Sequence, residues 1–460
     1  MKKRVLSLVL VFMLVVANFA ACTKNDEKSQ ETDSKDSKTE ETIETTESAE
    51  ASVTTVPEGI SSLSGEIVYW SMWQETESQA NILKSAIENF EKANPDCKVT
   101  VEWTGRTIKD VILPALESGE QIDIFDTDPN NIYKADASKL LDLTELYNSE
   151  SLQGTETVKD SLLGGLVSFD ETMSQKAGLT GYHSLPYSPY VVSFFYNKAQ
   201  FAQAGIDAVP KTWEEFDAVC AKLVAAGLVP FTVDDAYRDM IYSYYMQRAI
   251  GSEACAALVQ GTADSKSLWD DPMVKQMLTT MEDYAKKGYF SDNIDTNIYP
   301  AGQTEFALGN ATITINGSWF PSEVANMVDE SFQWGEFAIP TVTGSNVPIT
   351  ENNIGGQSFM VNASNQNKEA VFELLRYFIS NETQQKFTEN GLVPCTKSTD
   401  WPASVFDQKA IVESLTSNVD WCAGMETDFG MSVVLSELTK VMAGDQNADE
   451  ALTAIKGQIK

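Results

Sequence analysis

Few residues of this chain are suited to acid–base, nucleophilic or metal chemistry. His183 is the only histidine among 460 residues. No serine stands in a Gly-x-Ser-x-Gly pattern, so the sequence indicates neither a serine–histidine hydrolase nor a histidine-rich metal site. The 67 acidic residues make some close carboxylate pair inevitable, so their number does not indicate a glycosidase. We interpret the chain as a non-enzymatic protein with no resident cofactor or metal ion.

The cysteines do not form a disulfide framework or a zinc-binding pattern. Apart from Cys22, an odd number is spread along the chain, and no pair has the spacing of metal ligands. Cys220 lies on the apolar side of a predicted helix and is expected to be a small buried residue. A bridge between Cys395 and Cys422 is left open. The five cysteines beyond Cys22 are Cys97, Cys220, Cys255, Cys395 and Cys422.

The N-terminus carries the features of an exported protein. A basic start is followed by an apolar run over residues 5–16, too short to span a bilayer, which predicts a signal peptide over residues 1–22. Phe19-Ala20-Ala21-Cys22 resembles the lipobox of bacterial lipoproteins, although Phe19 departs from the usual aliphatic residue. The resemblance implies that Cys22 becomes the first residue and carries acyl chains such as palmitate. Ordinary secretion without an anchor is the alternative.

Residues 23–65 are rich in Ser, Thr, Glu, Lys and Asp, with few apolar residues. Such a segment cannot bury enough apolar surface to offset its ordering entropy, which predicts a disordered tether. The chain's net charge of −34 disfavours nucleic acid and anionic lipid as partners of the body. The body is therefore expected at the outer face of the bacterial cell membrane, held by the lipid anchor alone.

Strands and helices alternate at the start of the body. The order strand, helix, strand, helix, strand predicts right-handed crossovers and a parallel sheet. Ligands of such sheets bind beyond the carboxyl ends of the strands, here residues 71–75 and 126–130. The predicted elements are strand Glu66–Trp70, a helix ending at Asn94-Pro95, strand Val99–Trp103, helix Ile108–Leu116 and strand Ile122–Phe125.

A second α/β segment follows. Strand Val191–Tyr196 precedes a helix that begins with a capping box, in which Thr212 accepts from the Glu215 amide while Glu215 reaches back. Gly355-Gly356-Gln357 is expected to interrupt a later strand pattern. The remaining predicted elements are strands Ala311–Asn316, Trp334–Pro340 and Ser358–Val361, and helices near residues 368–379, 382–388, 432–442 and 448–455.

Five short motifs run in a fixed order along the body. They are Phe90–Pro95; Leu116–Gly119 with Ile122–Phe125; Leu185–Ser188 with Phe195–Lys198; Phe201–Gly205 with Val209–Phe216; and Phe306–Ala311 with Ile315–Trp319. In this order the chain resembles family 1 of the extracellular solute-binding proteins, the sugar-binding components of ABC importers related to maltose-binding protein. The resemblance covers nearly all of residues 66–460.

The resemblance implies an α/β fold of the type II periplasmic-binding-protein class, with two lobes and a ligand cleft between them. The first lobe is expected to comprise residues 66–188 and 357–394, and the second residues 190–354 and 396–460. Crossings are expected near Ser188–Val192, at Gly355–Gln357 and near Pro394–Thr396. Gly355 and Gly356 are expected to supply hinge dihedral angles.

A sugar presents an apolar face for aromatic rings and a rim of hydroxyls for polar groups. The resemblance places Trp319 as a stacking residue. Asp126 and Asp128 follow the predicted strand Ile122–Phe125 and are expected to be acceptors for vicinal hydroxyls or helix caps. Tyr190 replaces a carboxylate of the maltose-binding branch, which implies a different hydroxyl pattern. The expected ligand-binding residues are Trp73, Gln74, Glu75, Asp126, Asp128, Tyr187, Tyr190, Asp235, Arg238, Trp319 and Gln357, with Trp421, Asp428 and Phe429 as further candidates.

These inferences predict a monomeric, lipid-anchored receptor that captures a mono- or oligosaccharide by lobe closure and delivers it to an ABC permease. Closure requires that the ligand bind the closed state better than the open state. Two alternatives are kept: the same fold binding a non-sugar solute, and a surface lipoprotein with no role in transport.

Overall fold

The computed structural model of the chain describes residues 63–460, which all fall in one compact unit. The signal peptide expected over residues 1–22, its Cys22, and all but the end of the tether expected over residues 23–65 lie outside the described residues. Within the described range, no helix combines the length and the apolar character that a membrane crossing requires.

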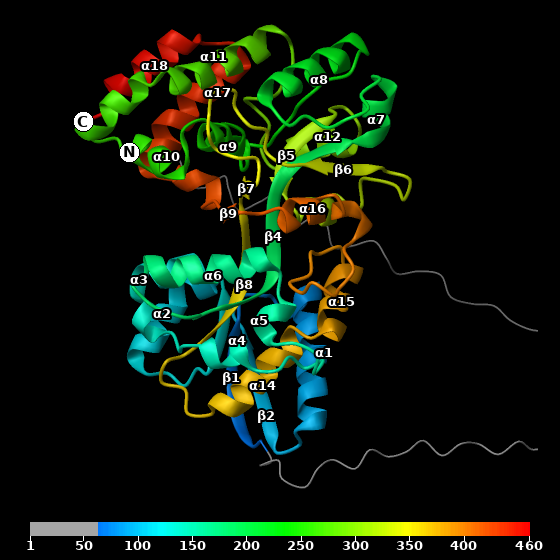
Figure 1. Cartoon of the computed structure of the whole chain (residues 1–460), viewed down its shortest axis with the longest axis vertical. Helices are drawn as coiled ribbons and strands as arrows, with labels where there is room; N and C mark the ends of the chain where they lie inside the picture. Colours follow the sequence, from blue (N-terminus) through cyan, green and yellow to red (C-terminus); the bar gives the residue numbers. More distant parts are fainter. Residues whose placement is uncertain (1–62) are drawn as a thin grey trace, which may run out of the picture. The chain divides into compact units, whose positions relative to one another are not determined.

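One mixed sheet has the strand order β2-β1-β3-β8-β4-β5, and β6 also pairs with β4 (Figure 1). β1 is parallel to β2 and β3, as the alternating sequence predicts, whereas β8, β4 and β5 run antiparallel to their neighbours. β7 and β9 form a separate parallel ladder. The strands are β1 (Gly65–Ser71), β2 (Cys97–Trp103), β3 (Ile124–Thr127), β4 (Leu185–Asn197), β5 (Ile313–Gly317), β6 (Trp334–Phe337), β7 (Glu351–Asn352), β8 (Ile354–Val361) and β9 (Ser417–Asn418).

The α-helices flank these strands (Figure 1). They are α1 (Ser78–Ala93), α2 (Ile108–Ser118), α3 (Pro129–Asp136), α4 (Thr144–Asn148), α5 (Val158–Ser161), α6 (Gly164–Lys176), α7 (Lys198–Gln203), α8 (Trp213–Ala225), α9 (Arg238–Ile250), α10 (Ser252–Leu258), α11 (Pro272–Lys286), α12 (Ala301–Ala307), α13 (Phe320–Glu323), α14 (Lys368–Phe378), α15 (Asn381–Glu389), α16 (Gln408–Glu413), α17 (Leu435–Ala443) and α18 (Ala448–Gly457).

Strand β4 connects two groups of elements. Its residues up to Val191 pair with β8, and from Val192 onward it pairs with β5 and β6. Its β-branched and aromatic residues suit a strand that is covered on both faces. Because successive side chains point to opposite faces, Phe194 and Phe195 enter different clusters of buried apolar residues.

We call residues 63–191 and 354–395 the first lobe, and residues 192–353 and 417–460 the second lobe. In the first lobe α1, α14 and α15 pack together beside β1, and in the second lobe α11 packs against α9, α17 and α18. Helix α16 contacts α6 of the first lobe as well as β4 and β6. This differs from the expected assignment of residues 396–460 to the second lobe alone, because α16 buries Ile411 and Val412 in the same cluster as the first-lobe core.

A side-chain cap fixes the start of α8. The Thr212 hydroxyl accepts from the Glu215 amide at 3.2 Å and caps α8. The Glu215 carboxylate accepts from the Lys211 amide at 2.7 Å instead of the Thr212 amide, so only half of the expected capping box forms. The glycines at 355 and 356, expected to interrupt a strand, lie inside β8.

The five cysteines of the described residues are buried and unpaired, so Cys395 and Cys422 do not form the bridge that the sequence left open. Cys220 is fully buried in the second-lobe core, as predicted. His183 is also buried and lies 3.2 Å from the Ser174 hydroxyl through Nδ1. Burial lowers the pKa of His183, so this side chain has the character of a packed core residue.

Candidate functional site

A cleft of about 630 Å³ is lined by both lobes and lies beyond the carboxyl ends of β1, β3 and β5. Two sets of side chains face it, and Gln357 of β8 also lines it. The set that we call the ordered wall is Trp73, Glu77, Arg106 and Asp128. The set that we call the aromatic wall is Tyr190, Tyr237, Trp319, Glu323, Trp421 and Glu426.

The ordered wall is fixed by contacts within the first lobe. Trp73 follows β1, and its indole Nε1 donates to the Tyr187 hydroxyl at 2.6 Å. The Arg106 guanidinium carbon lies 4.6 Å from the centroid of the Trp73 ring, a cation–π contact. Arg106 also donates to the Met72 carbonyl at 2.6 Å and to both carboxylate oxygens of Glu77. These contacts hold the ring and the cation in one arrangement.

Asp126 supports this wall from behind and does not line the cleft. The carboxylate is fully buried and accepts from the Tyr69 hydroxyl at 2.7 Å, from the Met72 amide at 3.1 Å, and from the Tyr187 hydroxyl. Burial raises the pKa of Asp126 to about 6, although the hydrogen bonds oppose the rise. Asp126 and Tyr187 therefore position the loop that carries Trp73.

Asp128 caps a helix, which is one of the two roles that the sequence left open, and it is also placed at the cleft. Its carboxylate accepts from the Asn130 amide at 2.9 Å and caps α3, and the same residue lines the cleft. Gln357 lies nearby along the cleft surface. Its Oε1 is buried and has no hydrogen-bond partner among the described residues. An unpaired buried acceptor in a cleft is a place for a donor on a ligand.

The aromatic wall consists of rings that contact one another. Trp319 and Trp421 lie with ring centroids 6.0 Å apart at an interplanar angle of 30°. Tyr190 packs by its edge against both, at 5.7 and 5.6 Å, and Tyr237 lies 6.1 Å from Trp319. Burial and the negative charge of Asp128 raise the pKa of Tyr190, so its hydroxyl stays protonated. The arrangement offers apolar ring faces with phenolic hydroxyls beside them.

Two glycines make room for these rings. A Cβ on Gly317 would lie 2.2 Å from ring atoms of Trp319, and a Cβ on Gly355 would lie 2.3 Å from the Tyr190 hydroxyl oxygen. Gly355 and Gly356 pair with β4 and are not among the glycines with positive φ. The unusual hinge dihedral angles that were expected at these two glycines are not seen in this structure. At Gly355, a glycine is required because the Tyr190 ring occupies the space of a Cβ.

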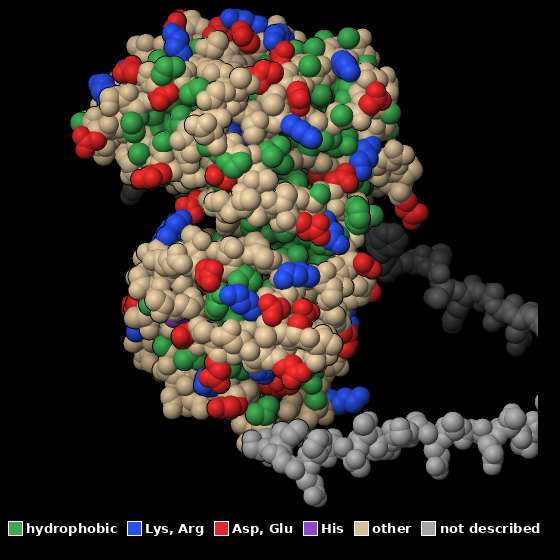
Figure 2. All heavy atoms as spheres, in the orientation of Figure 1, with side chains coloured by type: hydrophobic (Ala, Val, Ile, Leu, Met, Phe, Trp, Pro, Cys, Tyr) green, Lys and Arg blue, Asp and Glu red, His purple; other side chains and the backbone are tan. Residues whose placement is uncertain are grey.

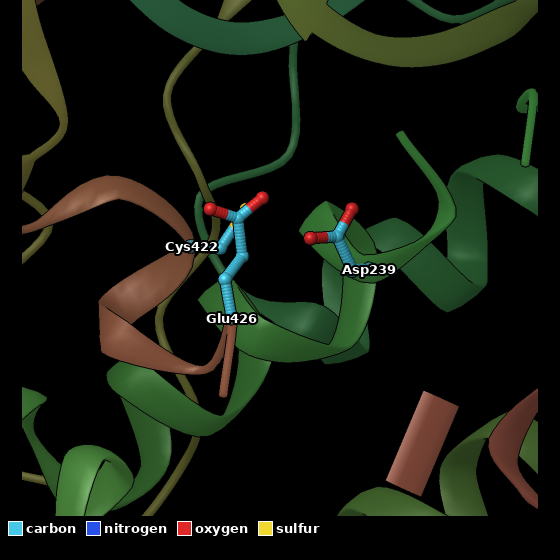
Figure 3. A group of neighbouring side chains, drawn as sticks. All are labelled: Asp239, Cys422 and Glu426. Carbon is cyan, nitrogen blue, oxygen red and sulfur yellow. The ribbon is translucent and has the colours of Figure 1, made fainter. Parts of the chain in front are cut away.

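Acidic groups face the cleft without matching cations. Glu77 is paired with Arg106, but Asp128, Glu323 and Glu426 form no ion pair with a described residue. Glu426 also lies with Asp239 and Cys422, and the three place ligand atoms within 4.8 Å of one another (Figure 3). Asp239 comes from α9, and the other two come from the segment at and after the turn Trp421–Gly424. These are the described side chains grouped closely enough to contact a single metal ion.

The cleft brings together some of the expected ligand-binding residues and leaves out others. Trp73, Asp128, Tyr190, Trp319 and Gln357 line it, and so does the further candidate Trp421. The expected residues outside the lining are Gln74, Glu75, Asp126, Tyr187, Asp235 and Arg238, and the further candidates Asp428 and Phe429 also lie outside it.

The residues outside the lining have other partners. Glu75 is exposed and pairs with Lys84 at 3.1 Å, while the exposed Gln74 side chain lies against Gly105. Asp235 accepts from the Tyr299 amide at 2.8 Å. Arg238 is the first residue of α9 and is buried. The preceding residue, Tyr237, lies in the loop before the helix and lines the cleft instead.

Sequence reasoning missed several lining residues. Tyr237 stands between the expected Asp235 and Arg238, and only the start of α9 decides which side chain points outward. In the sequence, Glu323 follows Trp319 and Glu426 follows Trp421, and both tryptophans were identified as candidates. A carboxylate three to five residues after an aromatic in a loop is too common to serve as a signal, so nothing in the pattern could have selected them.

Comparison with known proteins places this geometry in context. Residues 73–385 match the family model described as bacterial extracellular solute-binding protein. A multiple sugar-binding protein of Streptococcus mutans is 23% identical over 322 residues, covering 68% of this chain and 71% of that protein.

Solved structures give the same picture of the fold. RafE from Streptococcus pneumoniae in its apo form superposes with a TM-score of 0.67 at 19% identity, covering 87% of this chain and 98% of that chain. A family 1 extracellular solute-binding protein from Bifidobacterium longum subsp. infantis gives a TM-score of 0.62 at 21% identity, covering 86% of this chain and 99% of that chain.

Proposed function

The chain belongs to the bacterial extracellular solute-binding protein family, and from this premise we propose that it captures a carbohydrate by closing its two lobes and delivers it to an ABC permease. The observation that carries the proposal is the cleft between the lobes, where five aromatic rings stand beside acidic groups and an unpaired amide oxygen. Rings suit the apolar face of a sugar, and carboxylates suit its hydroxyls. Binding and release require no bond to be made or broken.

The proposed mechanism is a population shift between open and closed arrangements. A ligand that contacts the ordered wall and the aromatic wall together binds best when both walls are close, and it therefore favours closure. Bending is proposed at the level of Gly355 and Gly356, where β4 and β8 run between the lobes. The lobes as defined above are the proposed moving bodies, with α16 at their junction.

The names of relatives support a carbohydrate over other solutes. The Streptococcus mutans relative is described as a multiple sugar-binding protein, and RafE has also been solved in complex with raffinose. The proposed ligand-binding residues of this chain are those expected residues that line the cleft, with Tyr237 and Trp421 added. Asp126 and Tyr187 are proposed to act by positioning Trp73.

We also propose that Cys22 is lipidated and anchors the protein at the outer face of the cell membrane. The support is the sequence around Cys22 and the extracellular family to which the chain belongs. Detergent phase partitioning of the native protein and of Cys22→Ala tests this proposal. We expect the native protein in the detergent phase and the variant in the aqueous phase; partitioning of both into the aqueous phase would contradict an anchor.

Calorimetry with the purified full-length protein in detergent tests the binding proposal. A panel of neutral, amino and acidic mono- and oligosaccharides is compared with amino acids and short peptides as non-sugar solutes. We expect saturable binding of at least one saccharide class, together with compaction in small-angle scattering. Binding of a non-sugar solute alone would replace the proposed ligand class, and compaction with no solute would argue against closure.

A further inference from the structure

Resting on the proposed function, we propose that the preferred ligand of this cleft is a cationic carbohydrate, a saccharide that carries at least one free amino group. The inference concerns the charge of the ligand, which neither the fold nor the names of relatives specify. It is drawn from the balance of charged and aromatic groups around the cleft.

The first step is the charge balance. Among the charged residues that line the cleft, Arg106 is the only cation, and Glu77 holds it at 2.8 Å. Asp128, Glu323 and Glu426 remain, each without an ion pair to a described residue. When the lobes close, these like charges approach one another in a space from which water is displaced, which disfavours closure unless a positive charge enters with the ligand.

The surrounding protein does not supply that positive charge. Arg238 is the cation beside Tyr237, but it is buried behind the lining and donates to the Asn297 carbonyl at 3.4 Å. Instead, the group behind the lining is another acid: the buried Asp239, whose pKa burial raises to about 6, stands next to Glu426 (Figure 3). On the face drawn in Figure 2, acidic and basic side chains are interspersed over both lobes, in contrast to the lining of the cleft.

The aromatic wall suits a cation as well as a sugar ring. Tyr190, Trp319 and Trp421 meet one another at edges and faces, so their π faces are concentrated in one region beside Glu426. An ammonium group over such faces is attracted by the ring quadrupole. The ordered wall already shows this chemistry, because Trp73 carries the Arg106 guanidinium on its ring.

The hydrogen-bond inventory points the same way. The buried Oε1 of Gln357 lacks a donor among the described residues, and the unpaired carboxylates are acceptors only. A hydroxyl can donate one hydrogen bond, but a primary ammonium donates three and also neutralises charge. A neutral sugar would satisfy the acceptors without relieving the repulsion, and an acidic sugar would add to it.

Matched pairs of ligands test the proposal with the full-length protein. The probes are glucosamine against N-acetylglucosamine, galactosamine against N-acetylgalactosamine, and the β-1,4-linked disaccharide of glucosamine against its N-acetylated form, all measured at pH 6.5 by calorimetry in 20 and 300 mM salt. Neutral sugars without an amine, including raffinose and maltose, complete the panel. We expect the amine member of at least one pair to bind about tenfold more tightly, with the difference shrinking at high salt.

Two variants with the same net charge identify the origin of the preference. Glu323→Gln/Glu426→Gln neutralises two cleft carboxylates, whereas Glu117→Gln/Glu330→Gln neutralises two exposed carboxylates outside the lining. We expect the cleft variant to lose the amine preference and the control to keep it at low salt. Loss of the preference in both variants would assign it to the general field of the protein and overturn the proposal.

The remaining outcomes separate this inference from the proposed function. Binding of neutral sugars with equal or greater affinity overturns the cationic ligand but leaves the carbohydrate receptor intact. If no saccharide binds, both the cationic-ligand inference and the proposed carbohydrate receptor are overturned. Repeating the titrations with EDTA tests whether a metal ion bound by Asp239, Cys422 and Glu426 contributes to binding. If a saccharide binds only when a divalent cation is present, the metal supplies the positive charge and the proposal fails.

Discussion

The two walls of the cleft are built in different ways. In the ordered wall each functional group is held by a neighbour, as Trp73 is held by Tyr187 and Arg106 by Glu77. In the aromatic wall the rings hold one another, while Glu323 and Glu426 have no ion pair with a described residue. The difference teaches that the ordered wall presents side chains held by their neighbours, whereas the aromatic wall carries two carboxylates whose interactions remain to be completed by a ligand.

Among the variants considered, Trp319→Ala should cause the largest loss of ligand affinity, because it removes the ring that contacts three other residues of the aromatic wall. We expect affinity for the captured ligand to fall about 100-fold, or ~3 kcal/mol, measured by calorimetry. Phe406→Ala, a matched aromatic truncation at an exposed position outside the cleft, should leave affinity unchanged. A loss below about threefold would show that the aromatic wall does not carry the binding.

The contrast extends to buried acids away from the cleft surface. Asp126 in the first lobe receives three hydrogen bonds. In the second lobe, Glu336 Oε1 has no partner within residues 63–460, and its Oε2 accepts from the Asp407 amide at 3.1 Å. Burial, and then the charge of Asp407, raise the pKa of Glu336 to about 8.

Glu336→Gln tests this point through the pH dependence of stability. A raised folded-state pKa gives stability that is complete below the unfolded pKa and is lost as the pH rises through about 8. We expect the variant to be more stable than the native protein at pH 9 by about 2 kcal/mol, after allowing for an imperfectly paired buried amide, and to lose that advantage at pH 5. Chemical denaturation at both pH values measures the difference. An equal effect at pH 5 and pH 9 would exclude ionisation of Glu336 as the cause.

Gly355→Ala sharpens the explanation of how the aromatic wall is placed. The added methyl group would collide with the Tyr190 ring, so we expect affinity to fall about tenfold, or ~1.4 kcal/mol. Gly164→Ala, where a Cβ meets nothing within 4 Å, is the matched control. In a double-mutant cycle, Tyr190→Ala should abolish the effect of Gly355→Ala. An effect that persists without the ring would favour a backbone role for the glycine.

Arg106→Lys should have the smallest effect, because the pair with Glu77 is partly exposed and screened by solvent. Lysine keeps the charge but loses the planar fork that reaches both Glu77 and the Met72 carbonyl. We expect a two- to threefold loss of affinity by calorimetry. A loss as large as that of Trp319→Ala would mean that the ordered wall dominates recognition, contrary to the comparison.

The sequence was sufficient for features that depend on local pattern. Helix α1 follows from the apolar spacing that ends at Asn94, and the parallel arrangement of β1, β2 and β3 follows from alternating elements. Trp73 and Trp319 were placed at the ligand site by the resemblance to the solute-binding family, which matches the loops after their strands, and both line the cleft. The boundaries between the lobes remain predictions, since α16 contacts both sides.

The remaining site features depend on contacts between distant segments. Asp126 follows the same strand pattern as Asp128, yet hydrogen bonds from Tyr69 and Tyr187 draw it into the interior. Whether Tyr237 or Arg238 faces the cleft depends on where α9 begins. Such outcomes are decided by packing, which periodicity along one chain does not encode.

The pairing of β8 with both β3 and β4 has a consequence for how the protein is made. Strands β3 and β4 lack the strand between them until residues 354–361 have been synthesised. The ribosome must first make residues 198–353, which follow β4. Contacts so distant along the chain close slowly. The nascent polypeptide therefore cannot complete its N-terminal half early, and we expect this half to finish folding only after residue 361 has been made.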